Sequence, residues 1–337
     1  MEVSINTCTH RLANHVIFVL LHPETTHHIS PQLTMTVTAQ LPIVDLSSPD
    51  HLSLANSIRR ACEEYGFFYL INHGIEKGFI AEVFEESKKL FSLPLNEKMK
   101  LFRQNYRGYV PLYSQNFDFA SRNSKGSANE SFSIGPLENS ENRWPSEEVP
   151  PSWKPTMEAY HTNLLSTGKR VLSLMALALK LDKDYFDKIG APQGTLRLLH
   201  YPGEVERSEE EILSVAAHSD FGMITLLMTE GVPGLQVCRD KFKETPTWEN
   251  VLHMDGAFIV NIGDLMERWT NCSFRSTLHR VIPAGQKRYS MAYFVNPNPD
   301  CIVQCLESCY SESCPRRFPP IRSGDYIKEL LRLTYDS

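Results

Sequence analysis

The sequence predicts a mainly β protein with additional helices, built on a sandwich-like or barrel-like core of short strands. Apolar residues at helical spacing dominate the chain before residue 182, whereas short apolar runs separated by turn residues dominate from Thr195 onward. The 337 residues are 42% hydrophobic and 22% charged, which is ordinary for a globular chain of one large domain or two small ones. We find no internal repeat.

The first 34 residues differ from the rest of the chain. Their one apolar run, residues 16–21, is surrounded by His, Thr and Pro and is too short for a membrane helix. Met35 follows, and a strand-like pattern begins directly after it. We therefore expect residues 1–34 to be a disordered extension and Met35 to be the working start.

The region 35–155 is predicted to hold strands and helices followed by a long loop. In chain order we expect a strand at 41–47, a helix opened by Ser47, Ser48 and Pro49 and stopped by Gly66, a strand at 67–74, and a helix at 79–93. The stretch 105–152 is rich in Ser, Asn, Pro and Gly and is expected to be mostly loop.

A long helix is predicted over 155–181, because apolar residues recur on one face, and it belongs to a connecting region 156–194. Region 195–300 is expected to form the β core. Its predicted strands are 195–202, 224–230, 234–239, 258–263, 277–282 and 288–297. Region 301–337 is expected to be a loop and an amphipathic C-terminal helix. Asn261 and Gly263 suit a turn at a strand end, where Gly263 is expected to take a positive φ.

Composition excludes several function classes. The formal charge of −6 provides no basic face, so nucleic acid is not expected as a partner. No apolar run approaches membrane-spanning length, so no membrane partner is expected either. Separately, we expect a monomer.

The eight cysteines, without a clear secretory signal, indicate reduced thiols of a cytoplasmic protein. Cys301, Cys305, Cys309 and Cys314 cluster in the sequence, which raises the question of a zinc site. Because no C-x-x-C pair is present and the segment is rich in Ser, Glu and Pro, a loop with incidental thiols is the favoured interpretation.

His218 and Asp220 stand two residues apart at the start of an apolar run, in AAHSDFGMITLL. Residues i and i+2 of a strand point to the same face, so both side chains can converge on one point. His279, on a later strand, can supply a third ligand. Two imidazoles and one carboxylate leave three positions of an octahedron open, as non-haem Fe(II) oxygenases require. Alone, however, such a histidine is more often a hydrogen-bonded structural residue.

Arg288 and Ser290 follow His279 and also lie two residues apart on a predicted strand. A guanidinium fork with a hydroxyl beside it suits a carboxylate, which it can bind through charge-assisted hydrogen bonds. An acid that chelates a metal at one end needs such an anchor at its other end. The pair therefore favours the interpretation that the two histidines and the aspartate bind a metal.

Taken together, these residues resemble the plant-type, isopenicillin-N-synthase-like family of 2-oxoglutarate- and Fe(II)-dependent dioxygenases. HSD, H and RYS occur in this order, accompanied by the stretches GFFYLINHG, GVPGLQV, VNIGDLMERWTN and STLHRVI. The resemblance covers about residues 41–335. It implies a double-stranded β-helix (jelly-roll) core with an N-terminal helical region, a long packing helix and a C-terminal helix over the mouth.

The resemblance also implies roles for single residues. His218, Asp220 and His279 match the iron ligands, and Arg288 and Ser290 match the pair that binds the distal carboxylate of 2-oxoglutarate. The cofactors implied are Fe(II), with 2-oxoglutarate and O2 as co-substrates and ascorbate as reductant.

The family's N-Y-Y-P motif reads Leu199-His200-Tyr201-Pro202 here. Tyr201 matches the second tyrosine, whose hydroxyl also reaches the carboxylate of 2-oxoglutarate. Leu199 replaces the asparagine and makes that wall of the pocket apolar. His200 is expected to face away from Tyr201 and to be structural, because neighbouring strand residues alternate between faces.

The substrate pocket is expected at the mouth of the β core. Its candidate residues are Tyr106, Tyr109, Phe132, Phe221, Phe294 and Leu199, with Tyr113 and Phe117 as weaker candidates. An aromatic, weakly charged pocket predicts a mid-sized, mostly apolar small molecule, such as a specialised metabolite or a hormone.

The implied activity is oxidation of that molecule with release of succinate and CO2. Hydroxylation, desaturation, demethylation and ring closure all stay open, because they depend on substrate placement. Two other functions stay open as well: a metal-dependent hydrolase or isomerase on a similar barrel, and a non-catalytic member that binds a small molecule.

Overall fold

The computed structural model describes residues 37–117, 126–145, 149–203, 214–241, 243 and 246–336. The expected extension at 1–34 and the expected start at Met35 lie outside these residues.

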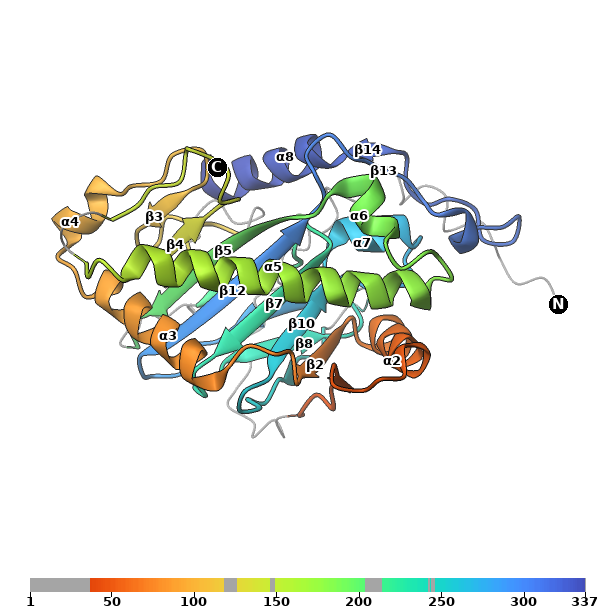
Figure 1. Ribbon diagram of the computed structural model, residues 1–337, viewed down its shortest axis with the longest axis horizontal. Helices are drawn as coiled ribbons and strands as arrows, with labels where there is room; N and C mark the ends of the chain where they lie inside the picture. Colours follow the sequence, from red (N-terminus) through yellow and green to blue (C-terminus); the bar gives the residue numbers. More distant parts are fainter. Residues whose placement is uncertain are drawn as a thin grey trace.

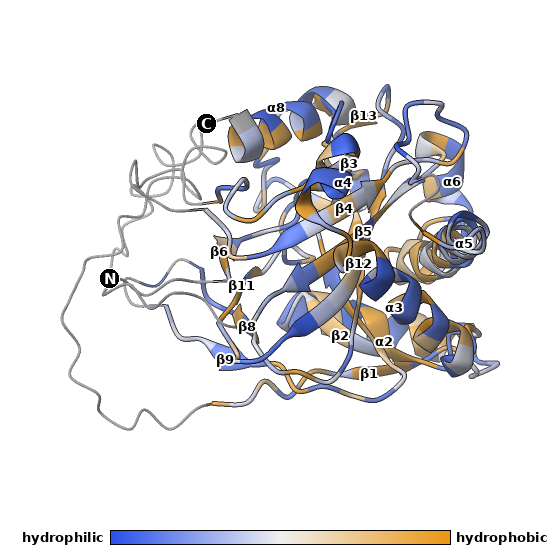
Figure 2. Cartoon of the chain, turned by 90° about the vertical axis from the view of Figure 1, so that its left-hand side faces the viewer, coloured by the Kyte–Doolittle hydropathy of each residue, from blue (hydrophilic) through white to orange (hydrophobic). Residues whose placement is uncertain are grey.

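Three layers make up the molecule, and Figure 2 shows them edge on. A four-stranded sheet faces an eight-stranded sheet, and helices cover the far side of the larger sheet. Side chains therefore meet in two places: between the two sheets, and between the large sheet and the helices.

The large sheet has the strand order β1-β2-β10-β7-β12-β5-β4-β3. Its strands are β1 (Ile43–Asp45), β2 (Phe67–Ile71), β3 (Gly108–Val110), β4 (Glu130–Ile134), β5 (Gln193–Tyr201), β7 (Ile224–Thr229), β10 (Phe258–Ile262) and β12 (Arg288–Asn296). Apart from the parallel pair β1–β2, all neighbours are antiparallel.

The small sheet has the order β6-β11-β8-β9. Its strands are β6 (Val215–His218), β8 (Leu235–Cys238), β9 (Glu249–Asn250) and β11 (Leu278–Val281). A short pair, β13 (Ile302–Val303) and β14 (Ile321–Arg322), precedes the C-terminal helix.

The longest helix, α5 (Trp153–Ala178), lies across the large sheet over β5, β12 and β7 (Figure 1). The other helical segments are α2 (His51–Glu64), α3 (Lys77–Phe91), α4 (Leu95–Lys100), α6 (Tyr185–Gly190), α7 (Asp264–Trp269), η1 (Glu307–Cys309) and α8 (Ser323–Asp336). The main core fills the space between these helices and the sheet, where Trp153, Trp269 and Phe132 are fully buried.

Most predicted elements are present, with shifted ends. Helix α2 begins at His51, because Asp50 caps it by accepting the N–H groups of Leu52 and Ser53. The predicted serine cap is therefore wrong by two residues. Gly66 follows the helix at φ +67°, as a residue that stops a helix does.

The expectation of a mostly irregular stretch at 105–152 is wrong in part. Strands β3 and β4 lie inside it and extend the large sheet beyond β5. These strands are short, and Ser131 and Ser133 on β4 give no apolar signal although both are buried.

The expected positive φ of Gly263 is also wrong, because its φ is −101°. The residue must be glycine for a different reason: a Cβ there would lie 2.4 Å from the carbonyl oxygen of Gly222. This close approach lets the Gly263 N–H donate to the carbonyl of Met223 at 2.9 Å.

Replacing Gly263 by alanine is predicted to lower the free energy of unfolding by about 1–3 kcal/mol, because the methyl group meets backbone that cannot rotate away. The measurement is urea denaturation followed by circular dichroism. Gly78→Ala in α3 is the control, since a methyl group at that position would have no neighbouring atom within 4 Å, and helix propensity predicts a gain of up to about 1 kcal/mol. Equal stability of Gly263→Ala and the parent would contradict the prediction.

Candidate metal centre and cosubstrate site

Two histidines meet across neighbouring strands of the small sheet. His218 ends β6 and lies opposite His279 of β11 in the strand register, and the two ring centroids are 4.3 Å apart. Each Nδ1 is within hydrogen-bond distance of a backbone carbonyl, at 2.9 Å for Ala216 and 3.2 Å for Thr277. Because a carbonyl only accepts, both Nδ1 atoms carry a proton, so in the neutral ring it is Nε2 that presents a lone pair.

Asp220 divides its two oxygens between two tasks. Its Oδ2 accepts hydrogen bonds from Thr225 on β7 at 2.6 Å and from Asn261 on β10 at 2.7 Å. Its Oδ1 points to the histidines, 3.9 Å from Nε2 of His218 and 3.8 Å from Nε2 of His279. The large sheet thus fixes the carboxylate, and the small sheet supplies the imidazoles.

The three ligand atoms all lie within 4.8 Å of one another. Nitrogen and oxygen ligands lie about 2.0–2.2 Å from a bound first-row metal, so two ligands of one ion can be about 4 Å apart. Both aspartate–histidine distances satisfy this limit. Two neutral imidazoles and one carboxylate suit Fe(II), and the residues present therefore fit that ion.

Electrostatics keeps these groups in the protonation states that bind metals. Burial lowers the pKa of His218 to about 3, with further contributions from the neighbouring His279 and from the positive charge of Arg197. Burial opposes ionisation of Asp220, but the positive charge that His279 and His218 carry when protonated, together with the hydrogen bonds from Thr225 and Asn261, outweighs it and lowers its pKa. At neutral pH, His218 is an uncharged donor and Asp220 is ionised.

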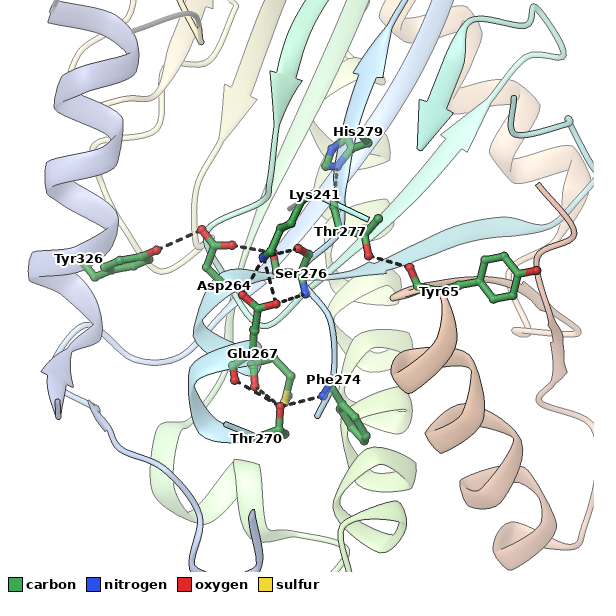
Figure 3. Close-up of polar contacts among 11 residues, drawn as sticks. Tyr65, Lys241, Asp264, Glu267, Thr270, Phe274, Ser276, Thr277, His279 and Tyr326 are labelled. Carbon is green, nitrogen blue, oxygen red and sulfur yellow. Dashed lines mark hydrogen bonds and ion pairs between the residues drawn. The ribbon is translucent and has the colours of Figure 1, made fainter. Parts of the chain in front are cut away.

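A polar network fixes the segment that leads into His279 (Figure 3). The Ser276 hydroxyl donates to Asp264 at 2.6 Å, and its backbone N–H donates to Glu267 at 3.1 Å. Lys241 donates to the Ser276 carbonyl at 3.0 Å. The hydroxyl, N–H and carbonyl of Ser276 are therefore all held, which fixes the chain just before the strand that carries His279.

Asp264 connects this network to two other parts of the molecule. Its backbone N–H donates to the carbonyl of Asp220 at 2.8 Å, and its carboxylate accepts from Tyr326 of α8 at 3.0 Å. One residue thus contacts the backbone of Asp220, the segment before His279 and the C-terminal helix. Figure 3 shows Asp264 between Tyr326 and Ser276.

Glu267 balances the charge of Lys241 inside this network, at 2.9 Å. Burial raises the pKa of Glu267, and the nearby Asp264 raises it further, while the Lys241 ammonium opposes both. An ion pair this deeply buried stabilises the fold only while both partners are present.

Arg288 begins β12 and lies opposite Tyr201 of β5 in the register, and Ser290 lies opposite Leu199. The guanidinium carbon of Arg288 is 4.7 Å from the centroid of the Tyr201 ring. Arg288 is only 3% exposed, yet its Nε and Nη1 are buried without a hydrogen-bond partner. Unpartnered donors on a buried cation are what a carboxylate ligand would satisfy, so the residues fit 2-oxoglutarate.

A small apolar cluster occupies the space between the two sheets. Its members are Leu199, Tyr201, Val215, Val281 and Ala292, with Phe117, Leu227 and Phe294 packed against them. Phe117 also stacks on His218, with ring centroids 4.3 Å apart. Of the predicted pocket residues, Leu199, Phe294 and Phe117 therefore lie on the metal side of the large sheet.

Other predicted pocket residues lie elsewhere. Tyr109 and Phe132 belong to the core on the helix side: Phe132 packs on Trp153, and the Tyr109 hydroxyl donates to Glu130. Phe221 is partly buried and also packs against that core, but it directly follows Asp220, so its place in the pocket stays a prediction. We leave Tyr109 and Phe132 out of the pocket. The cause is the unrecognised strand β4, whose alternation directs Phe132 away from the metal.

Two further predicted pocket tyrosines, Tyr106 and Tyr113, lie outside the apolar cluster between the sheets. Tyr106 packs against Tyr335 of α8, with ring centroids 5.9 Å apart. Tyr113 is 44% exposed, and neither ring belongs to the apolar cluster between the sheets.

Several residues of the site are not identified by the sequence analysis. Thr225 and Asn261 hold Asp220, although the sequence pattern assigns Asn261 only to a turn. Arg197 receives no role from the sequence, although it stands two residues before Leu199 and so shares its face. That spacing is the one available signal.

Other metal-ligand candidates do not form a site in the described part of the chain. The His–Asp–His group is the one cluster of three or more His, Cys, Asp or Glu side chains there. The cysteines at 301–314 form no disulfide bond and are not part of that cluster. His200 hydrogen-bonds Glu130 at 2.8 Å on the helix side of β5 and is structural, as predicted.

Two family models match the chain. One, described as the N-terminal part of a non-haem dioxygenase in morphine synthesis, matches residues 41–156. The other, described as the 2OG-Fe(II) oxygenase superfamily, matches residues 192–297, which contain every residue of the proposed iron and 2-oxoglutarate site.

Relatives and solved structures agree with these matches. Azadirone synthase LFS of Melia azedarach is 38% identical over 304 residues, covering 85% of this chain and 90% of that protein. The fungal 2-oxoglutarate-Fe(II) type oxidoreductase hxnY of Emericella nidulans is 33% identical, and the match covers 84% of this chain and 85% of that protein. The crystal structure of JOX2 in complex with 2OG, Fe and JA superposes with a TM-score of 0.76 at 27% identity. The superposition covers 92% of this chain and 91% of the JOX2 chain.

These likenesses confirm the expected double-stranded β-helix. Within the part of the chain that the structure describes, none of the helices combines the length and the apolar character that a membrane span requires. They give no support to the hydrolase, isomerase or non-catalytic alternatives. The chain belongs to the plant-type family of 2-oxoglutarate- and Fe(II)-dependent dioxygenases and is an oxidoreductase of that class.

Proposed function

We propose that the protein oxidises a small, mostly apolar molecule while it converts 2-oxoglutarate to succinate and CO2, with His218, Asp220 and His279 as its iron ligands. The observation that carries the residue assignment is the convergence of two free imidazole Nε2 atoms on one oxygen of Asp220. That oxygen makes no other hydrogen bond among the described residues, because Thr225 and Asn261 both use Oδ2.

The chain's own groups orient the reaction. Iron(II), when bound, supplies the oxygen chemistry. Backbone carbonyls hold both imidazoles in the tautomer that presents Nε2, and the hydrogen bonds to Oδ2 direct Oδ1 toward them. Phe117, stacked on His218, helps to exclude water from this face.

Arg288 and Ser290 are proposed to bind the distal carboxylate of 2-oxoglutarate, with Tyr201 beside them. Arg288 is buried and its Nε and Nη1 lack partners, so a carboxylate there gains charge-assisted hydrogen bonds in a dry surrounding. The Tyr201 ring packs over the guanidinium and limits its movement.

The substrate is proposed to be a specialised metabolite or a hormone. One relative is named for the synthesis of azadirone, and a solved relative contains JA, so similar proteins act on or bind small organic molecules. We further propose ascorbate as reductant and a cytoplasmic, monomeric enzyme; cysteine usage supports the compartment.

Replacing His218 or Asp220 by alanine is predicted to abolish binding of the Fe(II)–2-oxoglutarate pair, because each change removes one of three ligands. The measurement is the visible absorption of the anaerobic complex, together with succinate release during a metabolite screen. His51→Ala, at an exposed position of α2, should behave as the parent. An unchanged absorption band in His218→Ala would show that the metal assignment is wrong.

Arg288→Ala is predicted to raise the 2-oxoglutarate concentration needed for half-saturation on the order of 100-fold, since loss of one partner of a buried ion pair costs several kcal/mol. Affinity for Mn(II) without 2-oxoglutarate should stay the same. Titration of both ligands separates the two effects, and Arg288→Lys should retain part of the affinity. If Arg288→Ala saturated like the parent, another residue would have to bind the distal carboxylate.

Thr225→Val and Asn261→Ala are each predicted to weaken Mn(II) binding about 10–100-fold, because each removes a hydrogen bond that orients the Asp220 carboxylate toward the metal. Isothermal titration calorimetry measures this directly. Thr162→Val, on the exposed side of α5, is the matched control. Parent-like affinity in both variants would mean that metal binding does not depend on the hydrogen bonds to Oδ2 of Asp220.

A further inference from the structure

Arg197 lies inside the double-stranded β-helix, on the same face as the proposed 2-oxoglutarate site. On β5 it pairs with Ala292 of β12, just as Leu199 pairs with Ser290 and Tyr201 with Arg288. Residues 197, 199 and 201 alternate with Leu196 and Leu198, which belong to the helix-side core. The arginine side chain is therefore directed between the two sheets.

The guanidinium of Arg197 is buried and only partly satisfied. The residue is 8% exposed, and its Nη2 donates to Ser131 at 2.9 Å and to the side-chain oxygen of Gln115. Both acceptors are neutral. Its Nε is fully buried without a partner, and no carboxylate pairs with Arg197 in the described part of the chain.

The other cations of this interior are compensated in different ways. Lys98 pairs with Glu130 at 2.7 Å, and Lys241 pairs with Glu267 at 2.9 Å. Arg268 pairs with no carboxylate among the described residues but lies 4.7 Å from the ring centroid of Phe318, which compensates part of its charge. Arg288 is likewise unpaired there, and its donors are assigned to the distal carboxylate of 2-oxoglutarate. An arginine cannot lose its proton, so a buried and unpaired guanidinium costs free energy unless a ligand neutralises it.

2-Oxoglutarate cannot fill both arginine sites. The backbones of Arg197 and Arg288 are separated by four register positions along the paired strands, which corresponds to about 13 Å between their Cα positions at about 3.3 Å per residue. The distal carboxylate of 2-oxoglutarate is assigned to Arg288, and the keto-acid end faces the metal. An anion at Arg197 must therefore belong to a second molecule.

The surroundings of Arg197 place such a molecule beside the metal. Gln115, which accepts a hydrogen bond from Arg197, stands two residues before Phe117. The ring of Phe117 stacks on His218. The Tyr335 ring of α8 lies 6.0 Å from the guanidinium carbon, and the Asn116 N–H donates to the carbonyl of Thr334 at 2.9 Å. The C-terminal helix and the segment around Gln115 thus close over the arginine.

We infer that Arg197 binds a carboxylate of the primary substrate, which makes the substrate an apolar monocarboxylic acid. The carboxylate would pair with the guanidinium, and the carbon skeleton would lie along Leu199, Phe117 and Phe294 toward the metal ligands. This inference rests on the proposed function and replaces the expectation of a weakly charged pocket. Anchoring the acid at one end would fix which carbon faces the metal.

The test compares apolar acids with their methyl esters, using jasmonate, indole-3-acetate, cinnamate and abietate as probes. Each is titrated anaerobically into the protein loaded with Fe(II) and 2-oxoglutarate, and the change in the visible absorption band is followed. We expect the tightest probe to be an acid and its ester to bind at least tenfold more weakly. Arg197→Gln should weaken binding of the acid at least tenfold and leave the ester unchanged, while Arg197→Lys should retain part of the difference.

Arg316→Gln removes an exposed arginine and serves as the control. Parent-like acid binding in Arg197→Gln, tighter binding of esters, or no binding of any acid would each overturn the inference. The band itself reports iron and 2-oxoglutarate binding. If it forms in the parent and in Arg197→Gln, the iron and 2-oxoglutarate assignment of the proposed function holds whatever the acids do; if it is absent in the parent, the proposed function fails first.

Discussion

The carboxylate of Asp220 is the contact on which the site depends, because it joins the two sheets. One oxygen is fixed by Thr225 and Asn261 of the large sheet, and the other faces the two imidazoles of the small sheet. No single strand could bring these three donors together. The jelly-roll topology places them at the meeting point of two sheets, where a shared cation would relieve the cost of burying a carboxylate between uncharged rings.

The rest of the site follows from register and from a second polar layer. His218 and His279 are direct partners in the β6–β11 ladder, so a shift of one residue would turn one imidazole away. Ser276, held by Asp264, Glu267 and Lys241, fixes the chain just before β11 and resists such a shift. The C-terminal helix shares this layer through Tyr326, which joins α8 to the groups that fix the metal ligands.

The sequence is most informative where spacing and chemistry coincide. His218 and Asp220, two residues apart, and Arg288 with Ser290 can be found because alternation on a strand puts such pairs on one face. The errors arise where the strand itself gives no signal: β4 is built partly on buried serines, so Phe132 is assigned to the wrong face. Arg197 is missed because a charged residue within an apolar strand is not informative until its lack of a partner is seen.

The most direct measurement of the central claim is a crystal structure grown without oxygen in the presence of Fe(II) and 2-oxoglutarate, with anomalous differences recorded at the iron edge. The site geometry predicts one peak within bonding distance of Nε2 of His218, Nε2 of His279 and Oδ1, not Oδ2, of Asp220. A peak bound by other side chains, such as the thiols at 301–314, or iron held by Oδ2 after release of Thr225 and Asn261, would contradict the account.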